Sequence, residues 1–82
     1  MVISSFERTI SHDTPVEDLV WHRDEHDRNV TVLEGTDWFF QFDNQLPIKL
    51  EKDMNLFIGS MKYHRVIRGI DNLVINIKEE RL

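Results

Sequence analysis

A short stretch of the chain, residues 21–28, concentrates side chains that bind protons and metal ions. It reads WHRDEHDR and holds two histidines, three carboxylates and two arginines. If this stretch is extended, His22, Asp24, His26 and Arg28 share one face, because strand side chains alternate between two faces. Donors at i and i+2 supply only part of a metal's coordination shell, so a further ligand must come from elsewhere in the fold.

The candidate for that further ligand is His64, in the stretch KYHRVIRG. It lies near the start of a late predicted strand, where a β-barrel would bring it back toward the early strands. The alternative is that His22 and His64 are ordinary strand residues, each satisfied by a hydrogen bond. His12, in the polar stretch SHDTP, is not expected to take part in chemistry.

The elements that must position these residues are short strands. From residue 28 onward, apolar and polar residues alternate in runs that end at turn residues, which predicts six or seven strands and hardly any helix. Strands so short and closely joined indicate an antiparallel sandwich or barrel. The predicted strands fall within residues 28–35, 37–44, 46–51, 54–59, 63–69 and 72–79.

The two ends of the chain are less regular. The first twelve residues carry Phe6 and Ile10 and are a further candidate strand, in this chain or exchanged with a partner chain. Thr14 to Glu17 has the form of a capping box with proline at the first helical position, and predicts either a single helical turn or a loop. The C-terminal KEERL is expected to be a solvated end.

Composition bounds the class of protein. We expect the 82 residues to form a single domain spanning 1–82, and the formal charge of −5 disfavours nucleic acid and anionic membranes as partners. The chain has no cysteine, which excludes disulfides and thiolate metal sites. No stretch resembles a signal peptide or could span a bilayer, so the expected location is cytoplasmic. A barrel this small leaves strand edges to cover, which favours a homodimer.

The chemistry-bearing stretch resembles the first motif of the cupins, a family of small antiparallel β-barrels or jelly rolls. That motif reads His, any residue, His, a short gap, Glu, six residues and Gly. Counting back from Gly35 places Arg28 at the Glu position, and the two histidine positions fall on His22 and Asp24. The resemblance covers roughly residues 16–78.

The second cupin motif contains a further histidine, which aligns with His64. The other landmarks of that motif, Gly, Pro, Gly and Asn, then fall on Asp53, Gly59, Met61 and Arg68 respectively, so that none of the four is kept as the same residue type. The resemblance therefore implies an all-β, minimal cupin or jelly-roll-like antiparallel β-barrel.

The resemblance also implies a ligand set. His22, Asp24 and His64 would form a two-histidine, one-carboxylate site of the type used by non-haem Fe(II), which can also hold Mn, Ni or Zn. His26 is a substitute for Asp24 if the turn displaces the register. Arg28 cannot ligate a metal, because it stays cationic. It either pairs with Asp24 or Asp27, or points into the barrel and grips an acidic small molecule.

Two hypotheses of function follow. In the first, the protein binds a divalent metal at the barrel mouth and an acidic small molecule beside it, with Lewis-acid or oxygen-activating chemistry. In the second, it is a metal-free ligand-binding or structural module on the same barrel. Trp38 and Tyr63 are core residues by default and pocket-lining residues in the alternative interpretation. Whether the protein is an enzyme stays open.

Overall fold

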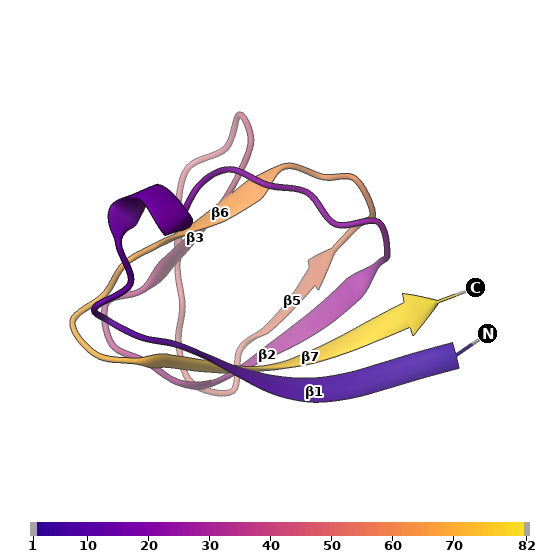
Figure 1. Ribbon diagram of the computed structural model, residues 1–82, viewed down its shortest axis with the longest axis horizontal. Helices are drawn as coiled ribbons and strands as arrows, with labels where there is room; N and C mark the ends of the chain where they lie inside the picture. The colour runs from indigo at the N-terminus through magenta and orange to yellow at the C-terminus, as the bar shows by residue number, and fades with distance from the viewer. Residues whose placement is uncertain (1, 82) are drawn as a thin grey trace.

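The alternating apolar pattern becomes an all-β fold in the computed structural model, which describes residues 2–81 (Figure 1). The one helical element in this range is a 3-10 turn, η1 (Val16–Asp18). The predicted all-β class is confirmed. The strands are β1 (Val2–Ile10), β2 (Arg28–Glu34), β3 (Phe39–Phe42), β4 (Ile48–Lys49), β5 (Asn55–Ile58), β6 (His64–Ile67) and β7 (Leu73–Arg81).

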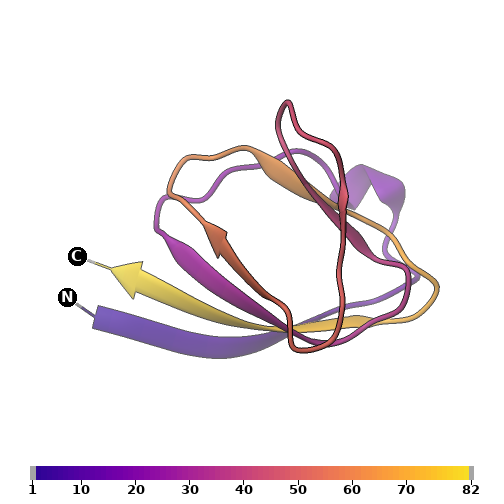
Figure 2. The same ribbon diagram turned by 180° about the vertical axis from the view of Figure 1, so that it is seen from behind.

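The strands form two antiparallel sheets that face each other, as seen from both sides in Figures 1 and 2. One sheet has the order β1-β7-β2-β5 and the other β4-β3-β6. The two sheets are not joined edge to edge into a closed barrel, so the prediction of a barrel holds for the cupin-like arrangement but not for closure.

The core lies between the sheets and follows the period-2 pattern. On β7, Leu73, Ile75 and Ile77 are buried, and Val30 and Val32 of β2 lie beside them. The opposite sheet contributes its own buried residues, Trp38 and Phe40 among them. Each fully buried side chain of this size stabilises the fold by about 1.5–3 kcal/mol, which makes this layer the main stabilising feature.

Near Trp38, polar groups of two loops form hydrogen bonds with one another. Trp38 Nε1 donates a hydrogen bond to the Asp71 carbonyl oxygen at 2.8 Å. The Asp71 carboxylate accepts from the backbone N–H and the hydroxyl of Thr36, at 2.6 and 2.7 Å. Gly69 lies so close that an added Cβ would overlap the Thr36 carbonyl oxygen and lie 2.5 Å from Trp38 Cδ1. Only glycine fits there.

Two local predictions fail. Pro15 precedes η1 without a side-chain cap, so the predicted capping box is absent although the single helical turn is present. Residues 20–27 do not form a strand: His22 makes one isolated bridge, and the chain bends at Glu25 and His26. The bend breaks the alternation on which a shared face for His22, Asp24, His26 and Arg28 depended.

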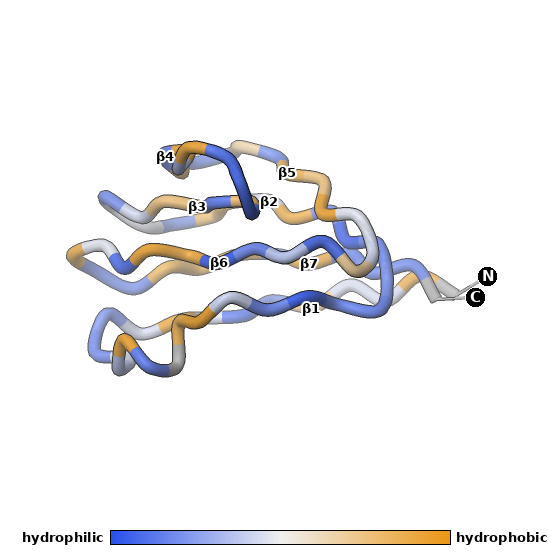
Figure 3. Tube along the Cα trace, turned by 90° about the horizontal axis from the view of Figure 1, so that it is seen from above, coloured by the Kyte–Doolittle hydropathy of each residue, from blue (hydrophilic) through white to orange (hydrophobic). Residues whose placement is uncertain are grey.

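The candidate N-terminal strand is confirmed as β1, which pairs with β7 of the same chain along its whole length. β1 lies at one edge of its sheet, and Figure 3 shows it at one side of the molecule. The predicted homodimer stays a prediction. Within residues 2–81, no helix has the length and apolar character needed to cross a membrane.

Candidate metal centre

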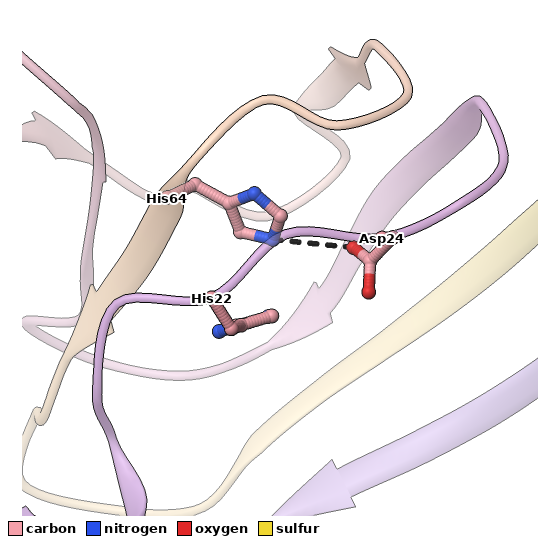
Figure 4. A group of neighbouring side chains, drawn as sticks. All are labelled: His22, Asp24 and His64. Atoms are coloured by element: carbon pink, nitrogen blue, oxygen red, sulfur yellow. Dashed lines mark ion pairs between the residues drawn. The ribbon is translucent and has the colours of Figure 1, made fainter.

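The structure brings His22, Asp24 and His64 together (Figure 4). One ligand atom from each lies within 4.8 Å of the other two. His22 and Asp24 belong to the segment between η1 and β2, whereas His64 begins β6. Donors bound to one ion through bonds of about 2.1 Å lie about 3–4 Å apart, so these atoms would each move by less than about 1 Å to close on it.

A backbone bridge sets this geometry. His22 N donates to the His64 carbonyl at 3.0 Å, and His64 N donates to the His22 carbonyl at 2.9 Å. Residues paired in this way project their side chains to the same side. The two imidazole centroids lie 4.3 Å apart, with the rings inclined by 65°.

Hydrogen bonds to backbone carbonyls indicate which ring nitrogen carries the proton in both histidines. His64 Nδ1 lies 2.8 Å from the Lys62 carbonyl oxygen, and His22 Nδ1 lies 3.1 Å from that of Val20. A carbonyl oxygen only accepts, so each Nδ1 carries the proton and donates it. In the neutral ring, Nε2 then keeps its lone pair. This is the arrangement in which metal-ligating histidines are usually held.

The Asp24 carboxylate has one oxygen without a hydrogen bond. Asp24 Oδ2 lies 3.3 Å from His64 Nε2, but it is buried and no group of the described residues gives it a hydrogen bond. Burial lowers the pKa of His64 below its ordinary value of 6.5, which favours the neutral ring at pH 7. An imidazole lone pair and a carboxylate oxygen therefore face each other, an arrangement that a cation between them would stabilise.

Arg28 supports Asp24 from the other side. Its Nη1 lies 3.5 Å from Asp24 Oδ1, and its Nε donates to Glu79 Oε2 at 2.8 Å. Glu79 is only 3% exposed, which contradicts the prediction of a solvated C-terminal end at this residue, whereas Lys78 and Glu80 are exposed as predicted. The pairing of Arg28 with Asp24, one of the predicted alternatives, is present. The pairing with Glu79 was missed, although the alternation Leu73, Ile75, Ile77 continues to position 79.

An apolar cavity of about 100 Å³ adjoins the two histidines of the cluster and runs between the sheets. His22 and His64 line it, as do Arg28 and Arg8, and all its other lining residues are apolar. Arg8 was not among the predicted site residues. The signal was its position in β1, where it shares the inner face with Phe6 and Ile10, since all three pair with buried residues of β7.

Other predicted site residues lie elsewhere. His26 is outside the cluster of ligand atoms. Trp38 is fully buried in the core and does not line the cavity. Tyr63 lies on the outer surface, with the Arg23 guanidinium 5.2 Å from its ring centroid. The structure thus brings together His22, Asp24, His64 and Arg28, and leaves the two aromatic residues apart from them.

Comparison with known proteins supports the fold. No protein-family model and no curated protein matches the sequence. Among solved structures, the crystal structure of FeII HppE superposes on 95% of this chain with a TM-score of 0.71 and 14% sequence identity. This chain spans 42% of the length of that neighbour. At so low an identity the likeness shows the fold alone, and that fold is cupin-like.

Proposed function

We propose that the protein binds one divalent transition metal ion through His22 Nε2, His64 Nε2 and the Asp24 carboxylate. The observation that carries the proposal is the buried Asp24 Oδ2, which lacks a hydrogen bond and faces the lone pair of His64. A buried polar atom without a partner is costly, and a cation would remove that cost. The likeness to FeII HppE agrees with a metal-binding cupin-like protein.

The ligand set restricts the kind of metal. Two imidazoles and one carboxylate suit Fe(II), Mn, Ni or Zn, and three protein ligands leave coordination positions open. When bound, such an ion supplies Lewis-acid or oxygen-activating chemistry. His22 is the exposed member of the set and His64 the buried one, so the open positions would face the His22 side.

Arg28 has a positioning role in this proposal. Because it contacts Asp24 Oδ1, the other carboxylate oxygen is left directed toward His64. Glu79 holds Arg28 in turn, so the three charged groups form a chain that fixes the carboxylate. Contact between Arg28 and an acidic ligand stays a prediction. Arg28 lines the cavity, which favours such a contact, but two carboxylates already compensate its charge.

The experiment is a metal titration of protein purified without a histidine tag. Zn²⁺, Mn²⁺, Ni²⁺ and, under anaerobic conditions, Fe²⁺ are titrated by calorimetry, and metal content is measured after dialysis. We expect one ion per chain for at least one metal. A metal at about 100 times its Kd stabilises the protein by about 2.7 kcal/mol, which raises Tm by roughly 10–20 °C in a domain of this size.

The variants His64→Gln and His26→Ala separate this site from binding by surface histidines. Gln preserves much of the imidazole volume but is a poor ligand, so His64→Gln should lose the bound ion and the rise in Tm. His26→Ala removes a histidine of the same loop that lies outside the cluster, and should bind as the unaltered protein does. Equal binding by both variants would show that His64 is not a ligand. If no metal binds, the alternative function, a metal-free binding or structural module, would replace this proposal.

A further inference from the structure

Arg8 is a cation without a counter-ion at the mouth of the apolar cavity. It lines the cavity from the inner face of β1, opposite the buried Ile75 of β7. Among the described residues, no hydrogen bond or ion pair engages its guanidinium. Arg28, the other arginine of the cavity, differs because it contacts two carboxylates. The charge of Arg8 is therefore available to a ligand.

Arg8 lies at the exposed edge of an apolar face. Its neighbours on the inner face of the sheet are Phe6 and Ile10 along β1 and Ile75 across from it. Arg8 is itself exposed, so water reaches its guanidinium and the ionic attraction at this site is modest. The planar guanidinium can also donate two parallel hydrogen bonds to one carboxylate.

The size and length of the cavity restrict the ligand. A cavity of about 150 Å³ accommodates benzene, so the 100 Å³ found here holds an apolar body of about four or five carbon atoms. Arg8 pairs with Ile75 and Arg28 with Glu79, four residues further along β7. At 3.3 Å per residue, the two arginines are offset by roughly 13 Å along the strand direction, on the strands that flank β7, and the arginine side chain itself spans part of that distance.

We propose that the cavity binds a short-chain aliphatic carboxylate, with its carboxylate on Arg8 and its apolar chain directed toward His22 and His64. In the reverse orientation, an apolar tail would end at the guanidinium and leave its charge unmatched. This proposal rests on the proposed metal centre only for the group that the far end of the aliphatic ligand would approach. The contact with Arg8 itself involves no metal, so the two proposals can fail separately.

The test uses pentanoate, with 1-pentanol as a neutral molecule of the same length, and follows protein amide shifts by NMR in the whole chain. Pentanoate is expected to bind and to shift residues that line the cavity, whereas 1-pentanol binds at least tenfold more weakly. Arg8→Gln should weaken pentanoate at least tenfold and leave 1-pentanol unchanged. Arg8→Lys, which keeps the charge but loses the two-pronged contact, should give a smaller loss.

Lys78→Gln is the matched control, because Lys78 is exposed on the outer face of the same sheet and its loss removes the same charge. It should bind pentanoate as the unaltered protein does. Binding should also persist in Asp24→Asn and in chelator, which separates this site from the metal. Equal binding by Arg8→Gln, loss of binding in chelator, or no binding at 50 mM pentanoate would each overturn the proposal.

Discussion

Two aspartates, Asp71 just before β7 and Asp24 before β2, show how differently this fold treats a carboxylate. Asp71 is exposed, and both of its carboxylate oxygens accept hydrogen bonds from Thr36. Asp24 is partly buried, and its Oδ2 has no hydrogen bond from the described residues. A buried oxygen is more costly to leave without a hydrogen bond than an exposed one, yet it is the more buried carboxylate, that of Asp24, whose oxygen lacks a hydrogen bond. In the proposed metal site, this difference would correspond to a structural role for Asp71 and a binding role for Asp24.

The largest effect is expected from Asp24→Asn. The amide keeps the shape of the side chain but removes the charged ligand, so metal affinity should fall more than 100-fold, or by more than about 2.7 kcal/mol. The free energy of unfolding of the metal-free protein should change by less than about 1 kcal/mol, because Oδ2 makes no hydrogen bond to lose and Arg28, which lies 3.5 Å from Oδ1, keeps its closer contact with Glu79. Calorimetric titration and chemical denaturation measure the two quantities. Full metal affinity in this variant would show that Asp24 is not a metal ligand.

Gly69→Ala tests the region around Asp71, where Gly69 packs against Thr36 and Trp38. The added methyl group would overlap the Thr36 carbonyl oxygen and crowd the Trp38 ring. Overpacking of this kind costs about 1–3 kcal/mol, which urea denaturation would detect. Metal affinity should stay the same, since the change lies at the other end of the interior. A variant that loses metal without losing stability would show that the two ends are not independent.

Glu79→Gln should have a smaller effect, confined to the metal end. The neutral amide holds Arg28 less firmly, and Arg28 in turn holds Asp24. Loss of a group that orients a metal ligand typically lowers affinity 10–100-fold, and we expect about tenfold here. Glu80→Gln, an exposed neighbour on the same strand, is the control in the same titration. An unchanged metal affinity in Glu79→Gln would show that the contacts from Glu79 through Arg28 do not orient Asp24.

The smallest effect concerns pH. Hydrogen bonds from the Thr36 hydroxyl and backbone N–H lower the pKa of Asp71 below its ordinary value of 3.8. Its contribution to stability is thus present above pH 3.8 and is lost as pH falls through the lower pKa of the folded state. Below pH 3.8, stability should fall less steeply in Asp71→Asn than in the unaltered protein. Parallel curves from thermal melts at successive pH values would contradict the assignment.

Much of this arrangement could be predicted from the sequence. Period-2 alternation predicted the strands from residue 28 onward, and the cupin resemblance implied the proposed ligand set of His22, Asp24 and His64. The bend at Glu25 and His26 could not be predicted, because it depends on how the chain crosses between the sheets. Sheet closure also escaped prediction, since it depends on which strand edges meet.

The charges around the site were harder to foresee than the ligands. Arg28 and Glu79 are 51 positions apart, and their contact follows from the pairing of β2 with β7 rather than from local sequence. Arg8 resembles any solvated arginine of an N-terminal strand until register places it on the inner face. Long-range pairing therefore decided which charges are compensated and which is available.

The most direct test of the metal centre is anomalous scattering from crystals of the unaltered protein saturated with the metal that binds most tightly. A single strong peak is predicted about 2.0–2.3 Å from His22 Nε2, His64 Nε2 and an Asp24 carboxylate oxygen. A fully occupied metal elsewhere on the chain, with no peak between these three side chains, would contradict the account.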